Sequence, residues 1–159
     1  MPDFDIKRLR RTMTIYRVVQ ILLLILLMYM TFNFQQMFSA RGKPGQLLPA
    51  IVAGIASQIL LFYPIYRLAL RDVGIESEGA TTGLSPGKHA ELRKKRLLGD
   101  MYKIAGIAFY MTFVAIMPDV KKSVGAQPVL AATVFSFLLA CLSYFQCFNH
   151  SMRKRISGG

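Results

Sequence analysis

Long runs of apolar residues, separated by short polar segments, dominate the sequence. The first run contains the stretch Ile21-Leu-Leu-Leu-Ile-Leu-Leu-Met28, in which no side chain is polar. About 18 or more apolar residues are typical of a membrane-spanning helix, since a helix rising about 1.5 Å per residue must cross about 30 Å of hydrocarbon. The first run also exceeds the apolar region of a cleaved signal peptide, so we expect a retained helix. The pattern predicts four spans, over residues 14–37, 47–70, 97–117 and 129–148.

These spans predict an all-α integral membrane protein with one membrane domain over residues 1–159. Short polar segments, at residues 39–46 and 118–128, join the first span to the second and the third to the fourth. Connections this short favour antiparallel neighbours, so we expect two antiparallel hairpins. Basic residues precede the first and third spans alike, which fits a weak tandem repeat. The alternative is that any hairpin inserted from the same side needs basic flanks.

The charge distribution predicts the orientation of the chain. The sequence has 20 Lys and Arg against 8 Asp and Glu, a formal net charge of +12, which in a soluble protein would indicate nucleic-acid binding. Sixteen of these 20 basic residues lie on the side of the termini and of the segment between the second and third spans; the others are Arg41, Lys43, Lys121 and Lys122. Because cytoplasmic loops hold the excess of Lys and Arg, we expect cytoplasmic termini and no nucleic-acid partner. A bacterial inner membrane fits best, with the endoplasmic reticulum as the alternative.

The segment between the second and third spans is predicted to be a flexible cytoplasmic loop over residues 71–92, because it is rich in Gly, Ser and Thr. Ser85 followed by Pro86 is typical of an N-cap and a first helical position, so a helix is expected to begin there and continue into the third span. The adjacent run of basic residues is a candidate contact for anionic lipid headgroups. It consists of Arg93, Lys94, Lys95 and Arg96.

Small residues spaced three or four apart lie on one face of the second and fourth spans. In lipid such faces allow helices to approach closely, either within the bundle, which we favour, or at an interface with a partner chain. The third span has a similar stripe at Ala108, Thr112 and Ala115, whereas the bulky first span is expected at the periphery. The candidate packing residues are Ala50, Gly54, Ser57, Ala132, Ser136 and Ala140.

Few polar side chains fall within the spans, where ionisable residues would point to a transport path or a catalytic site. The candidate polar membrane positions are Gln20, Asn33, Gln58, Asp100 and Lys103. Gln58 lies near the middle of the second span, and Pro64 beyond it is expected to bend the helix. We expect an interhelical hydrogen bond from Gln58; the alternative is a polar site for a ligand.

Motifs that carry catalytic or cofactor chemistry do not occur in the sequence. His89 and His150 have no metal-ligand spacing with Cys141, Cys147 or each other, and a haem would need an axial ligand from elsewhere. The two cysteines point in different directions on a helix, so we expect buried free thiols. Glycine-rich phosphate loops and nucleophile elbows are lacking as well. We therefore expect no catalytic site, no metal site and no cofactor.

Three hypotheses of function remain. The favoured one is an accessory or scaffolding subunit of a larger membrane complex, because the loops are short and the spans carry small-residue faces. The second is a homo-oligomeric transporter or channel, since four helices are too few to enclose a pathway alone. The third is a lipid-acting enzyme that uses Asp100, Lys103 and Arg67 at the cytoplasmic interface. The expected partners are a bilayer with anionic lipids and either a partner protein or further copies of the chain.

Overall fold

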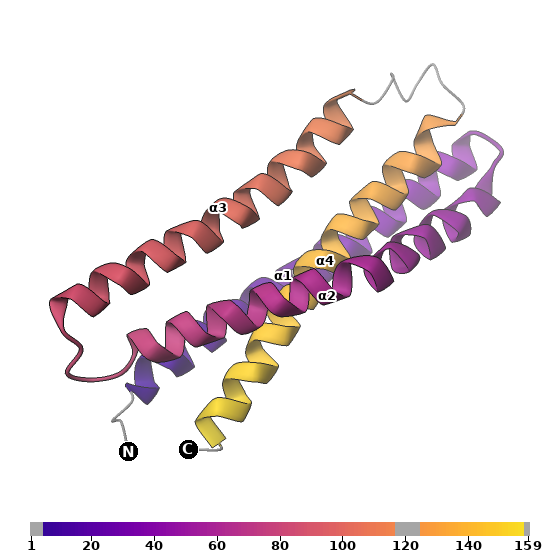
Figure 1. Ribbon diagram of the computed structural model, residues 1–159. Coiled ribbons are helices and arrows are strands. Elements are labelled where there is room, and N and C mark those ends of the chain that lie inside the picture. The colour runs from indigo at the N-terminus through magenta and orange to yellow at the C-terminus, as the bar shows by residue number, and fades with distance from the viewer. Residues whose placement is uncertain (1–4, 117–124, 158–159) are drawn as a thin grey trace.

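The structure, a computed structural model, describes residues 5–116 and 125–157, and these residues are helical almost throughout (Figure 1). The described elements are α1 (Ile6–Ala40), the short 3-10 helix η1 (Pro44–Gln46), α2 (Leu47–Gly79), α3 (Pro86–Ile116) and α4 (Ala126–Ser157). All four long helices are long and apolar enough to cross a membrane. The predicted all-helical chain with four such helices is confirmed. Most of the predicted connection at residues 118–128 lies outside the described residues.

The helices continue beyond their apolar spans at the end of the bundle where the two chain termini lie (Figure 1). We call this end the terminal end; it comprises residues 6–13, 71–96 and 149–157. The opposite end, which we call the loop end, comprises residues 38–50 and 126–130.

The prediction of a loop over residues 71–92 is wrong for most of this segment. α2 runs on to Gly79 and α3 begins at Pro86, so only residues 80–85 lie between the two helices. Contacts with other helices stabilise the last turns of α2, and such contacts outweigh the weak helix preference of Gly, Ser and Thr. The predicted start of α3 is confirmed, because the N–H of Lys88 donates to Ser85 Oγ at 3.4 Å.

The bundle is held together mainly where α2 packs against α4, which is the most extensive contact between two helices in the described chain. Gly54 of α2 makes this close approach possible: a Cβ added there would lie only 2.9 Å from Phe135 Cβ of α4. Buried apolar side chains form one cluster near each end of the bundle. The loop-end cluster holds Phe34, Phe38, Ala50, Ala131 and Phe135, and the terminal-end cluster holds Leu9, Met13, Ala69, Val73, Ala80, Phe148 and Met152.

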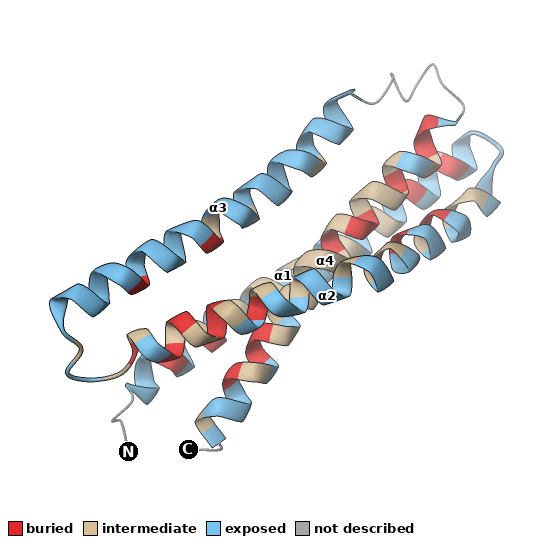
Figure 2. Cartoon of the chain, viewed as in Figure 1, coloured by how far each residue is buried: buried red, intermediate tan, exposed pale blue. Residues whose placement is uncertain are grey.

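α3 stands apart from the other three helices. Figure 2 shows it exposed along almost its whole length; between Pro86 and Ile116 only Leu92 and Gly99 are buried. The sequence predicts that the first span is the peripheral one, and the middle of α1 is indeed exposed, but both ends of α1 pack into the two clusters. The peripheral helix of this bundle is therefore α3. The sequence does not mark α3 as the peripheral helix in advance, because its small-residue stripe resembles those of α2 and α4.

Candidate functional site

A group of charged side chains attaches α3 to the bundle toward the terminal end. Lys103 Nζ of α3 lies 2.7 Å from Asp72 Oδ2 of α2 and 3.1 Å from Asp100 Oδ1 on its own helix. The hydroxyl of Tyr144 on α4 donates to the same Asp72 oxygen at 2.5 Å. A Cβ on Gly99 would lie 3.0 Å from Asp72 Oδ1, so this glycine lets α3 approach the carboxylate closely. Asp72 thus joins three helices through one buried carboxylate.

Further polar contacts between α2 and α3 continue toward the connection at residues 80–85. Arg96 forms an ion pair with Glu76, and Arg71 donates to the backbone carbonyl of Lys95 at 3.0 Å. The Arg71 guanidinium also lies over the Tyr102 ring, 5.9 Å from its centroid. The terminal half of α3 is therefore attached to α2 by charged groups rather than by apolar packing.

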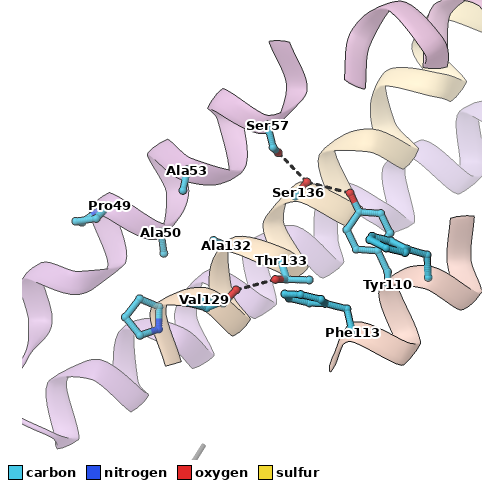
Figure 3. A pocket seen from close by; sticks show the side chains of 12 residues that line it. Pro49, Ala50, Ala53, Ser57, Tyr110, Phe113, Val129, Ala132, Thr133 and Ser136 are labelled. Atoms are coloured by element: carbon cyan, nitrogen blue, oxygen red, sulfur yellow. Dashed lines mark hydrogen bonds between the residues drawn. The ribbon is translucent and has the colours of Figure 1, made fainter. Parts of the chain in front are cut away.

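Farther along α3, Tyr110 makes a polar contact with another helix, and a cavity opens beyond it (Figure 3). Tyr110 Oη lies 3.0 Å from Ser136 Oγ of α4, and Ser136 Oγ lies 2.7 Å from Ser57 Oγ of α2. Toward the loop end, a mostly apolar cavity of about 500 Å³ separates Phe109 and Phe113 of α3 from α2 and α4. The small side chains on α2 and α4 that form its other wall are Ala50, Ala53, Ala132 and Thr133.

The predicted polar positions lie in separate places and form no common site. Gln58 Nε2 donates to the Ser136 carbonyl at 2.9 Å, which links α2 to α4, and Gln58 Oε1 has no partner among the described residues. Gln20 donates to Gln146 at 3.1 Å, which links α1 to α4. Asn33 donates at 2.8 Å to the Tyr29 carbonyl, so this hydrogen bond stays within α1. Of the predicted positions, only Asp100 and Lys103 meet in one cluster.

Most of the small residues predicted for packing lie where α2 meets α4 within this chain. Ala50, Gly54 and Ser136 are buried, Ser57 and Ala132 are half-buried beside them, and Ala140 is half-buried on α4. A partner chain cannot reach Gly54, because Phe135 and the Ser136 backbone of α4 already lie against it. The corresponding stripe of α3 is different: Ala108, Thr112 and Ala115 are all exposed, so the packing expected there is not formed within the described chain.

The predicted run of basic residues divides between two sides of α3. Arg93 and Arg96 line a cavity of about 330 Å³ together with His89 and with Arg8 of α1. Lys95 lies elsewhere, with Nζ 2.7 Å from Glu91 Oε1. The hydrogen bond from Lys95 lowers the pKa of the Glu91 carboxyl, and the same bond raises the pKa of Lys95, so both groups are charged near neutral pH. Arg93 and Arg96 therefore have different surroundings from Lys95.

Asp72 holds α3 through Lys103, and Tyr144 binds the same carboxylate, yet no sequence pattern points to either residue. Asp72 falls in the segment predicted to be a loop, where its neighbours in space are undefined. The sequence pattern that could have pointed to Asp72 is its spacing of four residues from Glu76. In a helix this spacing places the two carboxylates on the same face. Tyr144 looks like an ordinary interfacial aromatic residue in the sequence.

Within the described residues, no group of three or more His, Cys, Asp and Glu side chains is placed to hold a metal ion. Cys141 and Cys147 are free, half-buried thiols. Arg67, which the lipid-enzyme hypothesis places beside Asp100 and Lys103, instead donates to the Tyr63 hydroxyl on its own helix at 3.2 Å.

Comparison with known proteins identifies no relative: no family model matches the chain, and no curated protein or solved structure matches it. Hypotheses about function therefore depend on the geometry of the described residues alone.

Proposed function

We propose that this chain is a small accessory subunit of a larger membrane complex and that it binds a transmembrane helix of a partner protein through α3. In this proposal the chain crosses the membrane four times as two antiparallel hairpins, with its terminal end in the cytoplasm. The observation that carries the proposal is the exposed small-residue face of α3. This face is defined by Ala108, Thr112 and Ala115.

These three residues lie on one side of α3, since positions three, four and seven apart share a helix face. Phe109 and Phe113, which line the cavity, lie on another side of the helix. The small-residue face therefore points away from α2 and α4. In lipid, faces of this kind allow two helices to approach closely, and van der Waals contact then drives their association. On α2 and α4 the equivalent faces are already covered by each other.

The attachment at the terminal end supports the proposal, because it gives the exposed face a fixed orientation. Lys103 is held by Asp72, and Arg96 is paired with Glu76, so α3 cannot rotate about its axis without breaking both contacts. A face with a fixed orientation loses less conformational entropy on binding than a mobile one.

Bulky residues on this face should release the partner. In the double variant Ala108→Leu/Thr112→Leu, a partner helix can no longer approach closely, so its recovery with the chain should fall by about tenfold, equivalent to about 1.4 kcal/mol. The measurement is quantitative mass spectrometry of proteins that co-purify from the native membrane in a mild detergent. Ala56→Leu is the matched control, because Ala56 is an exposed alanine in the middle of α2.

The proposal is wrong if the double variant retains its partner, or if Ala56→Leu removes the partner equally. Recovery of further copies of the chain and no foreign protein would also contradict it, and would favour the homo-oligomeric transporter or channel. No contact in the described residues favours that alternative. The lipid-enzyme hypothesis is weaker still, because Lys103 forms ion pairs with two carboxylates. Arg67 lies apart from them and donates a hydrogen bond to Tyr63 on its own helix.

The proposed orientation predicts the location of the connection between α2 and α3. A reporter inserted within residues 80–85, or fused after Gly159, should be cytoplasmic, because most of the Lys and Arg residues lie at the terminal end. A reporter inserted after Lys43 should be on the opposite side. Reporter activity in a bacterial inner membrane, the compartment that we favour, measures both. A terminal-end reporter on the outer side would refute the orientation while leaving the binding role of α3 open.

A further inference from the structure

A cavity lined by basic side chains lies at the terminal end, among the start of α1, the end of α2 and the start of α3. Its volume is about 330 Å³, within the roughly 300–1,000 Å³ range of small-molecule sites. Arg8 of α1 and His89, Arg93 and Arg96 of α3 line it, and Ile75 and Leu92 form an apolar part of the wall. Two separate helices thus contribute guanidinium groups to one space.

The positive charge of this lining is only partly balanced by the protein. Among the described residues, the ion pair made by these three guanidinium groups is that of Arg96 with Glu76. Arg8 Nη1 donates to the Gly79 carbonyl at 3.1 Å, which fixes its side chain across the gap from α1 to α2. A guanidinium has five N–H donors, so one bond to a carbonyl leaves Arg8 with donors to spare.

We propose that this cavity binds a phosphate group, held by the guanidinium groups of Arg8, Arg93 and Arg96. The planar fork of arginine matches two oxygens of a phosphate, which makes such contacts shorter and stronger than those of lysine. Basic pockets between transmembrane helices on the cytoplasmic side hold the headgroups of anionic lipids in this manner. The nearest source of the group is therefore a phospholipid in the adjoining leaflet, and a soluble phosphate has the same chemistry.

A phosphate site in this cavity uses only some of the four basic residues in the run on α3, although all four carry the same charge. Arg93 and Arg96 line the cavity, whereas Lys94 and Lys95 do not. Lys95 is also paired with Glu91 on its own helix. A diffuse attraction to an anionic surface would depend on all four residues about equally, since each adds about 1 kcal/mol near the surface. A phosphate site depends on two of the four and on Arg8.

Native mass spectrometry of the full chain, released from nanodiscs of phosphatidylcholine with a minor fraction of phosphatidylglycerol, tests the site. The wild-type chain should retain one phosphatidylglycerol molecule. In Arg8→Gln/Arg93→Gln that retention should fall by about tenfold, equivalent to about 1.4 kcal/mol. The control Lys94→Gln/Lys95→Gln removes the same charge and should lower retention much less, because neither lysine lines the cavity. If the wild-type chain retains phosphatidylglycerol, equal loss in both variants or no loss in either would overturn the proposal.

A second arm of the experiment separates the two sources of phosphate. Inorganic phosphate is added to the detergent-purified chain, and the melting temperature is compared between the wild type and Arg8→Gln/Arg93→Gln. If phosphate raises the melting temperature of the wild type alone while phosphatidylglycerol is not retained, the site takes a soluble phosphate. If neither probe binds, the proposal is wrong.

A variant that fails to fold would leave retention uninterpretable, so the single variants Arg93→Gln and Lys94→Gln provide the fallback comparison. Both side chains are exposed, and each substitution removes one positive charge. Lower retention in Arg93→Gln alone supports the site; equal retention in the two variants overturns it. These outcomes are independent of the partner-binding proposal, because they involve the terminal end and not the exposed small-residue face of α3.

Discussion

Replacement of Asp72 by Asn should lower the free energy of unfolding by about 2 kcal/mol, because it leaves Lys103 without its most buried counter-charge. The Asp72 side chain is only 10% exposed, whereas that of Lys103 is 30% exposed. Loss of one partner of a fully buried pair costs roughly 3–5 kcal/mol, and the partial exposure of Lys103 reduces this. Tyr144 also loses a charged acceptor for its hydroxyl. Equilibrium unfolding in mixed detergent micelles measures the change.

Asp100→Asn is the matched control for this prediction, because Asp100 contacts the same ammonium group. Its side chain is 51% exposed, so its removal should cost less than about 1 kcal/mol. The double variant Asp72→Asn/Lys103→Gln should recover part of the stability lost in Asp72→Asn, since no charge is then left unpaired. Equal destabilisation by Asp72→Asn and Asp100→Asn would show that the buried carboxylate does not hold α3.

The sequence predicted the elements of this fold better than their arrangement. Apolar runs of about 20 residues are sufficient to predict the four helices, since little else satisfies the backbone of such segments in a bilayer. The start of α3 could also be predicted, because Ser85 and Pro86 act locally. The helical extension of α2 to Gly79 could not, because it depends on contacts of Asp72 and Glu76 with residues of other helices that lie far away in the sequence.

Dependence on contacts that are distant in the sequence also explains why the peripheral position of α3 could not be predicted. Three helices carry small residues at helical spacing, and the pattern alone does not say which stripe meets which. In the structure, Gly54 brings α2 against α4, and the stripe of α3 is left exposed because α3 is attached through Lys103 and Arg96 instead. A face is predictable from local spacing, whereas its partner is a property of the whole bundle. Local spacing therefore identifies small-residue faces on α2, α3 and α4, but it does not predict that the face of α3 is the exposed one.

Replacement of Gly54 by Ala should destabilise the bundle by about 1–3 kcal/mol, the usual cost of overpacking a well-packed interface. The added Cβ would lie 2.9 Å from Phe135 Cβ and 3.4 Å from the backbone nitrogen of Ser136. Neither of these atoms is at the flexible end of a side chain, so relief requires α2 and α4 to move apart. Because Ser57 and Gln58 bind to Ser136 across the same contact, their hydrogen bonds should lengthen as well.

Gly106→Ala on α3 is the matched substitution, since nothing lies within 4 Å of an added Cβ there. Alanine is the better helix former by about 1 kcal/mol, so this variant should be neutral or slightly stabilised. The two substitutions add the same methyl group to helices in the same protein, and only Gly54→Ala should lower the free energy of unfolding. If Gly54→Ala were as stable as Gly106→Ala, then α2 and α4 would not be in close contact at this position. The α2–α4 interface would then not be the main contact of the bundle, and α3 could not be identified as its peripheral helix.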